Sequence, residues 1–93
     1  MIISFDDKKT ENFYHGIGSP PFSKEIKERA LRKLDLLNAA CALEDLKIPP
    51  GNRLEKLSGK LKDFHSIRIN EKYRVVFIWK NNNAHNVSII DYH

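Results

Sequence analysis

The hydrophobic pattern of this 93-residue chain changes its period once, across the segment Ile48-Pro-Pro-Gly-Asn52. Before this break, apolar side chains recur every three or four residues, and the clearest run consists of Ile26, Ala30, Leu34, Leu37 and Cys41. After the break, apolar residues alternate with polar ones or form short β-branched runs. A period near 3.6 places side chains on one face of a helix, whereas a period of two places them on one face of a strand. The chain therefore predicts helices followed by a sheet, which is an α+β fold.

Two helices are expected before the break. The first follows Asp6 and Asp7 and ends near Gly16, because acidic side chains favour a helix N-terminus and glycine favours the position just past its end. The second follows the N-cap Ser23 and extends for about sixteen residues or more. Cys41 continues its apolar stripe, so we expect this cysteine in the core, where a free thiol behaves as a small hydrophobe. The apolar residues 2–5 predict an edge strand.

Three strands are expected after the break, over residues 65–70, 73–79 and 87–93. Asn70-Glu-Lys72 forms the connection between the first two, and Asn81-Asn-Asn83 forms the next hairpin tip because asparagine tolerates positive φ. We therefore predict a single domain, residues 1–93, in which two N-terminal helices pack on one face of a small, mainly antiparallel sheet.

Composition indicates the cellular compartment of the protein. Cys41 is the single cysteine, which excludes an internal disulfide and favours a reducing compartment. The first residues lack the cationic and apolar regions of a signal peptide, and no apolar run approaches the ~20 residues of a membrane-spanning helix. We expect a cytoplasmic protein without a membrane partner.

The net charge of +4 is distributed unevenly. Residues 1–50 carry eight Lys or Arg and eight Asp or Glu, whereas residues 51–93 carry eight Lys or Arg and four Asp or Glu. A positive excess confined to the predicted sheet indicates an anionic partner, of which nucleic acid is the commonest. A chance imbalance on a solvated surface is the alternative.

Two classes of site find no support in the sequence. The four histidines (His15, His65, His85 and His93) form no i, i+4 pair on a helix, and one cysteine cannot build a zinc cluster. Gly16-Ile-Gly18 lacks the third glycine and the preceding long strand of a phosphate-binding loop. We therefore expect neither a metal nor a cofactor.

Two arginines on the predicted sheet are candidates for phosphate binding. Arg68 and Arg74 flank the 70–72 connection, one on each strand of a hairpin, and we expect both on the face away from the helices. The planar guanidinium fork binds phosphate in a bidentate manner. The alternative is that both are solvated strand charges.

The last three residues, Asp91, Tyr92 and His93, continue the β-branched run of the final strand. Strand alternation places Asp91 and His93 on one face and Tyr92 on the other, unless a bulge intervenes. A carboxylate beside an imidazole raises the imidazole pKa toward neutrality, which suits proton transfer. Together with arginines, this set is adequate for RNA cleavage through the ribose 2′-hydroxyl, a nucleophile that DNA lacks. The alternative is a frayed chain end without function.

Six segments share an order and spacing that is specific when taken together: Met1-Ile-Ile-Ser-Phe5, Arg29-Ala-Leu-Arg-Lys-Leu34, Pro49-Pro-Gly-Asn-Arg-Leu-Glu-Lys-Leu-Ser-Gly59, Ser66-Ile-Arg-Ile-Asn70, Tyr73-Arg74 and Asp91-Tyr-His93. Through them the chain resembles the HigB toxins of the RelE/ParE toxin superfamily along essentially its full length. The resemblance implies a RelE-like fold and the toxin of a type II toxin–antitoxin system. It further implies a ribosome-dependent, metal-free endoribonuclease that cleaves translated mRNA in the 30S A site. A HigA-like helix-turn-helix antitoxin is the implied partner, and operator DNA is bound only through that antitoxin.

The resemblance also assigns roles to single residues. Arg74 is similar to the family's phosphate-stabilising arginine, while Asp91 and His93 match family residues that are assigned to acid–base catalysis. Tyr92 matches a residue that holds the substrate base, although a core role is equally compatible with its strand position. Arg53, Lys56 and Arg68 are expected to bind mRNA or rRNA phosphates.

Two positions depart from the family pattern, and the first of them affects the chemistry. Glu55 stands where better-known HigB toxins have a histidine, and Ser58 stands at the place of a neighbouring lysine. An exposed glutamate with a pKa of ~4.3 is a weak general base. We therefore expect either a larger role for His93 in proton transfer or a slow enzyme, and in consequence a mild toxin.

Two other functions fit the same fold. One is a non-enzymatic, ParE-like inhibitor that binds gyrase, against which Asp91 and His93 argue because such an inhibitor needs no titratable cluster. The other is an antitoxin-binding module with weakened activity, which Glu55 favours.

Overall fold

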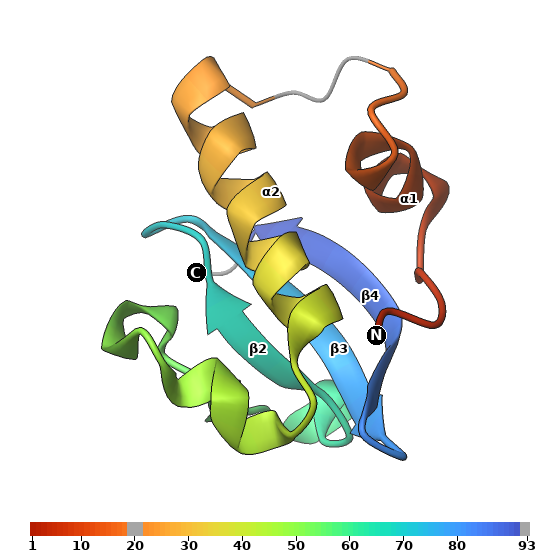
Figure 1. The fold of residues 1–93 in the computed structure, drawn as a ribbon, viewed down its shortest axis with the longest axis vertical. Helices are drawn as coiled ribbons and strands as arrows, with labels where there is room; N and C mark the ends of the chain where they lie inside the picture. Colours follow the sequence, from red (N-terminus) through yellow and green to blue (C-terminus); the bar gives the residue numbers. More distant parts are fainter. Residues whose placement is uncertain (19–21, 92–93) are drawn as a thin grey trace.

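The computed structural model describes residues 1–18 and 22–91. Along the chain these form α1 (Lys8–Tyr14), α2 (Lys24–Ala39), the short 3-10 helices η1 (Leu43–Lys47) and η2 (Pro50–Asn52), β1 (Glu55–Lys56), the 3-10 helix η3 (Gly59–Leu61), β2 (His65–Arg68), β3 (Tyr73–Lys80) and β4 (Asn83–Asp91). The described strands form one antiparallel sheet in the order β1-β2-β3-β4. Figure 1 shows α2 lying across one face of this sheet and α1 beside β4. The expected α+β arrangement is confirmed.

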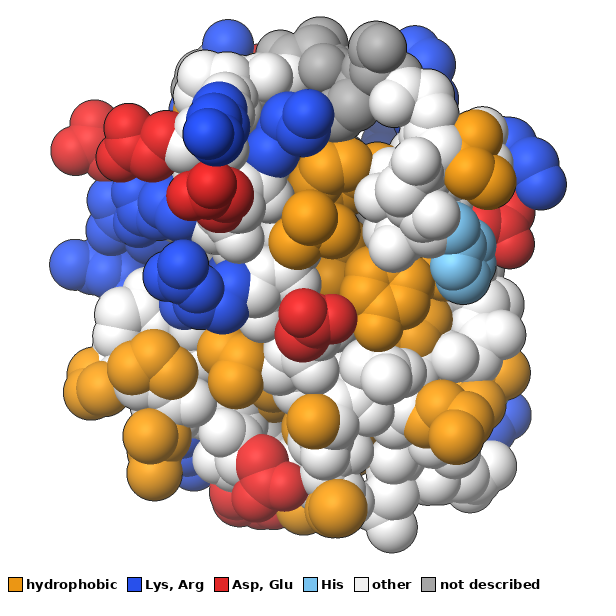
Figure 2. Space-filling view, turned by 45° about the horizontal axis from the view of Figure 1, so that its top comes forward, with side chains coloured by type: hydrophobic (Ala, Val, Ile, Leu, Met, Phe, Trp, Pro, Cys, Tyr) orange, Lys and Arg blue, Asp and Glu red, His pale blue; other side chains and the backbone are white. Residues whose placement is uncertain are grey.

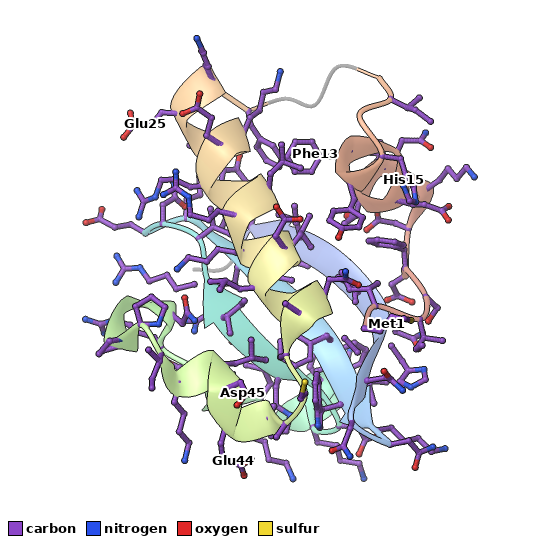
Figure 3. The ribbon with its side chains drawn as sticks, in the orientation of Figure 1. Met1, Phe13, His15, Glu25, Glu44 and Asp45 are labelled. Atoms are coloured by element: carbon purple, nitrogen blue, oxygen red, sulfur yellow. The ribbon has the colours of Figure 1, made fainter. Side chains whose placement is uncertain are left out.

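Both helices begin at the predicted residues because a side chain caps each N-terminus. Asp7 accepts a hydrogen bond from the Thr10 amide (2.6 Å), and Ser23 accepts one from the Ile26 amide (3.3 Å). From α1, Phe13 lies between the two helices (Figure 3) and is almost fully buried. The apolar stripe of α2 covers the sheet with three residues that are 0% exposed: Ala30, Leu34 and Leu37.

The expected place of Cys41 in the core is wrong, since this residue is exposed. α2 ends at Ala39, and Ala40 adopts an extended conformation (φ −64°, ψ 132°), so the helical period no longer applies to the next residue. Ala40 is buried in its place, at 6% exposure. Asp45, labelled in Figure 3, accepts hydrogen bonds from the amides of Cys41 (2.9 Å) and Ala42 (3.1 Å) and so begins η1.

The hairpin between β3 and β4 turns at two left-handed asparagines, Asn81 (φ 53°) and Asn82 (φ 59°), as predicted. β4 begins directly after them, at Asn83 rather than at the expected Val87. Its pairing with β3 shifts in register beside a third left-handed asparagine, Asn86 (φ 54°). Strict alternation of side chains does not hold across such a bulge, so it does not predict the part of the strand before Val87.

The apolar residues 2–5 lie along β4, but they form less than the predicted edge strand. Two isolated parallel bridges join Ile2 to Ala84 and Phe5 to Val87. These bridges make the chain start the neighbour of β4, and they leave the sheet mainly antiparallel, as expected.

β3 has one face toward the helices and one face away from them. Val75 and Phe77 belong to the hydrophobic core beneath α2. Arg74 and Val76, which alternate with them, lie on the opposite face. In the register of β2 and β3, Arg74 lies opposite Arg68, so both arginines occupy the face where the sequence predicts them.

Candidate active site

Arg74 is a buried and well-anchored charged side chain of the sheet. It is 8% exposed, and its Nη2 donates a hydrogen bond to the Arg53 carbonyl (2.7 Å). Its Nη1 lies 3.6 Å from Oε1 of Glu55. Arg53 directs its carbonyl at the guanidinium from a left-handed backbone conformation (φ 46°, ψ 57°). The interpretation of Arg74 as a solvated strand charge is therefore wrong.

A hollow of about 290 Å³ surrounds this guanidinium, and we call it the arginine hollow. Its lining consists of Arg53, Glu55, Arg68, Asn70, Glu71 and Arg74. The residues come from the loop after η2, from β1, from the end of β2, from the connection to β3 and from the start of β3. The structure thus brings together four of the residues singled out in the sequence: Arg53, Glu55, Arg68 and Arg74.

Asn70 and Glu71 belong to the same hollow, and the sequence reasoning missed them as site residues. Asn70 shapes the turn, because its Oδ1 accepts hydrogen bonds from the amides of Lys72 (3.0 Å) and Tyr73 (2.7 Å). Its carbonyl also accepts a hydrogen bond from Arg68 Nε (3.1 Å). A connection between two arginine-bearing strands was the available signal, since its residues must lie beside both arginines.

Asp91 does not line the arginine hollow. In the β3–β4 register it pairs with Tyr73, whereas the partner of Arg74 is Ile90, so Asp91 lies on the opposite face. There it contacts Lys72 (Nζ to Oδ2, 3.7 Å) and borders a separate, larger cavity of about 590 Å³ beside α1. The predicted combination of Asp91 with the arginines in one site is therefore not found in the arginine hollow. Tyr92 and His93, the other two C-terminal candidates, lie outside the described residues.

Lys56 also lies outside the arginine hollow. It follows Glu55 on β1 and pairs with His65 on β2, so the alternation of the strand directs it away from the hollow. Burial, and to a smaller extent the charge of Lys56, lowers the pKa of His65. His65 also stacks on Phe77 (6.2 Å between ring centroids).

The family model of the HigB-like toxins, described as the RelE-like toxin HigB of type II toxin–antitoxin systems, matches residues 3–93. The chain belongs to this family. Toxin HigB-1 of Vibrio cholerae serotype O1 is 48% identical over 80 residues, which are 85% of this chain and 84% of that protein. This protein is thus a HigB toxin of a type II toxin–antitoxin system.

Solved structures of the same fold come from Staphylococcus aureus. The chain is similar to one in a YoeB–YefM complex (TM-score 0.63) and to one in a heterotetrameric YoeB–YefM toxin–antitoxin complex (TM-score 0.58). In both cases the identity is 18%, and the match covers 100% of this chain and 98% of the other. The likeness establishes the RelE-like fold.

The lining of the arginine hollow combines three arginines with two glutamates, Glu55 and Glu71. Figure 2 shows most of the Lys and Arg side chains of one face gathered on its left, with others at the top and on the right. In the arginine hollow, three guanidiniums can donate hydrogen bonds to phosphate oxygens, while Glu55 can accept a proton. Within residues 1–18 and 22–91, no group of three or more His, Cys, Asp or Glu side chains is placed to hold a metal ion, and no helix there is long and apolar enough to cross a membrane.

Proposed function

We propose that this toxin is an endoribonuclease that cleaves translated mRNA on the ribosome without a metal ion, and so inhibits translation and growth. The observation that carries the proposal is the arginine hollow, in which the Arg53 carbonyl holds the guanidinium of Arg74 beside Arg68 and Glu55. A buried, oriented guanidinium stabilises developing negative charge more strongly than a mobile one in water. The position of Arg74 therefore supports a role in phosphoryl-transfer chemistry.

In the proposed reaction, the ribose 2′-oxygen attacks the adjacent phosphorus, and the bond from phosphorus to the 5′-oxygen breaks. The 2′-hydroxyl proton passes to the Glu55 carboxylate while Arg74 stabilises the charge of the phosphorane. His93 donates the proton that the leaving 5′-oxygen takes up. The products are a 2′,3′-cyclic phosphate and a 5′-hydroxyl, so DNA is not a substrate.

The remaining candidates bind and orient in this proposal. Arg53 and Arg68 hold phosphates next to the scissile one, and Lys56 contacts a phosphate farther along the strand. Tyr92 stacks on a base in this proposal. Asp91 orients His93, and the chain must depart from strand alternation after Asp91 for the imidazole to reach the face of Arg74. The hollow is small, about 290 Å³, which supports a reaction in which the ribosome presents and holds the message.

Primer extension on a defined mRNA tests the proposal. Purified toxin is added to ribosomes that are translating the message, and new 5′ ends inside the reading frame are mapped. We expect such ends with the native toxin, at least about a hundredfold fewer with Arg74→Lys, and an unchanged number with Lys80→Gln. Lys80 is exposed at the far end of β3, so its variant removes one positive charge outside the hollow. Absence of new ends with the native toxin contradicts the proposal, and in that case gyrase inhibition is the activity to assay.

A second candidate is an antitoxin-binding module with weakened activity. The observation that favours it is the contact between Glu55 and Arg74, because a carboxylate beside the guanidinium occupies a place that a phosphate needs. Under this candidate, new 5′ ends stay at the level of Arg74→Lys even at high toxin concentration.

We propose a HigA-like helix-turn-helix antitoxin as the protein partner, with operator DNA bound only through that antitoxin, and the cytoplasm as the site of action. The type II toxin–antitoxin description of the family supports this partner. Co-purification of the toxin with the product of the adjacent reading frame tests it. Toxicity that co-expression of that product leaves unchanged contradicts it.

A further inference from the structure

Asn52 is an asparagine with no solvent exposure. Its Nδ2 donates hydrogen bonds to the carbonyls of Leu46 (3.1 Å) and Ile48 (3.3 Å). Its Oδ1 accepts a hydrogen bond from Nζ of Lys33, which lies on α2. Both donors of the amide are thus used within the fold.

These contacts fix the segment that leads into the arginine hollow. Leu46 belongs to η1, Ile48 follows η1, and Asn52 is the last residue of η2, so one side chain holds both short helices against α2. The backbone N–H of Asn52 donates to the Pro49 carbonyl (2.9 Å), and the backbone N–H of Arg53 donates to the Pro50 carbonyl (3.1 Å). The path of the chain from η1 to Arg53 therefore depends on Asn52.

Arg53 is the point at which this path reaches the arginine hollow. Its left-handed conformation (φ 46°, ψ 57°) is unfavourable for a residue with a Cβ and persists only where neighbouring contacts impose it. The same conformation directs the Arg53 carbonyl to Nη2 of Arg74, at 2.7 Å. A shift of η2 would move this acceptor and, with it, the guanidinium.

We infer that Asn52 and Lys33 are positioning residues for Arg74: they hold η2 so that the Arg53 carbonyl orients the guanidinium within the arginine hollow. The inference rests on the proposed function. It assigns a role in the reaction to a residue of α2, a helix that does not contribute to the lining of the hollow.

The charges around Lys33 provide a matched control. Arg29 and Arg32 are exposed on the same helix near Lys33, and burial together with these two charges lowers the pKa of Lys33. Arg29→Met thus removes a positive charge from the same stretch of α2 but leaves the contact with Asn52 intact. Lys33→Met removes that contact, and Lys33→Arg retains a donor at this position.

Single-turnover cleavage on ribosomes that carry a defined mRNA tests the inference. We expect Asn52→Asp, which keeps the volume but loses both donors, to lower the rate at saturating ribosome concentration at least about tenfold without changing the half-saturating concentration. Lys33→Met lowers the rate about threefold or more, Lys33→Arg restores most of it, and Arg29→Met leaves it unchanged. If Asn52→Asp fails to fold, the comparison of Lys33→Met with Lys33→Arg decides.

A double-mutant cycle separates positioning from a general loss of stability. When Asn52→Asp acts through Arg74, it causes little further loss in an Arg74→Lys background. If the rate losses of Asn52→Asp and Arg74→Lys multiply in the double variant, the inference is overturned. A lowered Tm with an unchanged cleavage rate in Asn52→Asp overturns it as well.

An NMR measurement keeps the inference testable even if the native toxin cleaves no mRNA, in which case the proposed function alone fails. The Nε–Hε signal of Arg74 reports the surroundings of its guanidinium. We expect this signal to shift or broaden in Asn52→Asp and Lys33→Met and to stay in place in Arg29→Met. A signal that is unchanged in the first two variants overturns the inference.

Discussion

Arg68 and Arg74 lie directly opposite each other on neighbouring antiparallel strands. Like charges in such cross-strand pairs are destabilising. Glu55 and Glu71 line the same hollow, and Glu55 lies 3.6 Å from Arg74, which offsets part of the repulsion. A bound phosphate offsets more of it, because its oxygens accept hydrogen bonds from guanidinium groups. We therefore expect the pair to link the stability of the fold to anion binding.

Replacement of Arg68 by glutamine tests this link. The variant removes the like-charge repulsion but also the hydrogen bond from Arg68 Nε to the Asn70 carbonyl. These effects have opposite signs, so we expect its Tm without added anion to lie within about 2 °C of the native value. We expect inorganic phosphate to stabilise the native toxin through binding to the folded state, and most of this gain to disappear in Arg68→Gln. Thermal unfolding at increasing phosphate, with total ionic strength held constant, measures both effects. Lys80→Gln is the control, and an equal loss of the phosphate effect in that variant argues against a site at the hollow.

Glu55 is the position at which a substitution is expected to raise the proposed cleavage activity. An imidazole with a pKa near neutrality is a better general base at pH 7 than an ordinary carboxylate. We expect Glu55→His to raise the single-turnover cleavage rate about tenfold at pH 7 and to make the rate dependent on pH between about 5.5 and 7.5.

Glu55→Gln provides the comparison for that prediction. It keeps the size of the side chain and removes its basicity, so the rate falls if Glu55 accepts the 2′-hydroxyl proton. A Glu55→Gln toxin that cleaves as fast as the native one shows that another group is the base. A faster Glu55→Gln toxin indicates instead that the carboxylate inhibits Arg74.

The helix start at Ser23 and the hairpin turn at Asn81 and Asn82 were predictable because capping and turn formation depend on residues next to each other in the chain. Ser23 and the asparagines 81 and 82 perform in the structure the capping and turning roles that their side chains favour in any context. Cys41 shows the limit of such reasoning. Its apolar spacing is correct, but the helix ends at Ala39, because Asp45 binds the amides that follow.

The candidate site was predictable in part for the same reason. Arg68 and Arg74 flank a short connection, so their proximity follows from the sequence. The burial of Arg74 does not follow from the sequence, since its 8% exposure depends on contacts with residues about twenty positions earlier in the chain. Asn52 lies in a Pro-Pro-Gly-Asn segment that predicts only a loop, and its burial depends on an equally distant residue of α2. Alternation along β4 could not say on which face of the sheet Asp91 lies, because the face depends on the register with β3.

The C-terminal residues give a prediction that separates His93 from Asp91. If His93 protonates the leaving oxygen, His93→Ala lowers cleavage about a hundredfold or more and abolishes growth arrest on induction. We expect Asp91→Asn to be milder, less than about tenfold, because Asp91 lies on the opposite face from Arg74 and only orients His93 in the proposed mechanism. Growth curves and single-turnover cleavage measure both variants, with exposed His15→Ala as the control (His15 is labelled in Figure 3). Undiminished toxicity of His93→Ala contradicts the assignment.

His65 makes the stability of the toxin depend on pH in a predictable direction. Burial, followed by the charge of Lys56, lowers the pKa of this histidine below its ordinary value of 6.5. Between pH 6.5 and the lower pKa of the folded state, the unfolded chain binds more protons than the folded one. The contribution of His65 to the free energy of unfolding is therefore fully present above pH 6.5 and is lost as the pH falls below that value.

His65→Phe isolates this contribution because phenylalanine keeps the ring that stacks on Phe77 and does not titrate. We expect the native toxin to lose stability relative to His65→Phe when the pH is lowered from about 7.5 to about 5.5, as measured by urea unfolding at both pH values. Lys56→Gln removes the second cause of the shift, so the loss becomes smaller in that variant. His15→Phe, at an exposed position on the C-terminal side of α1, is the matched control. A difference between native toxin and His65→Phe that is the same at both pH values contradicts the prediction, since titration of His65 must then be equal in the folded and unfolded states.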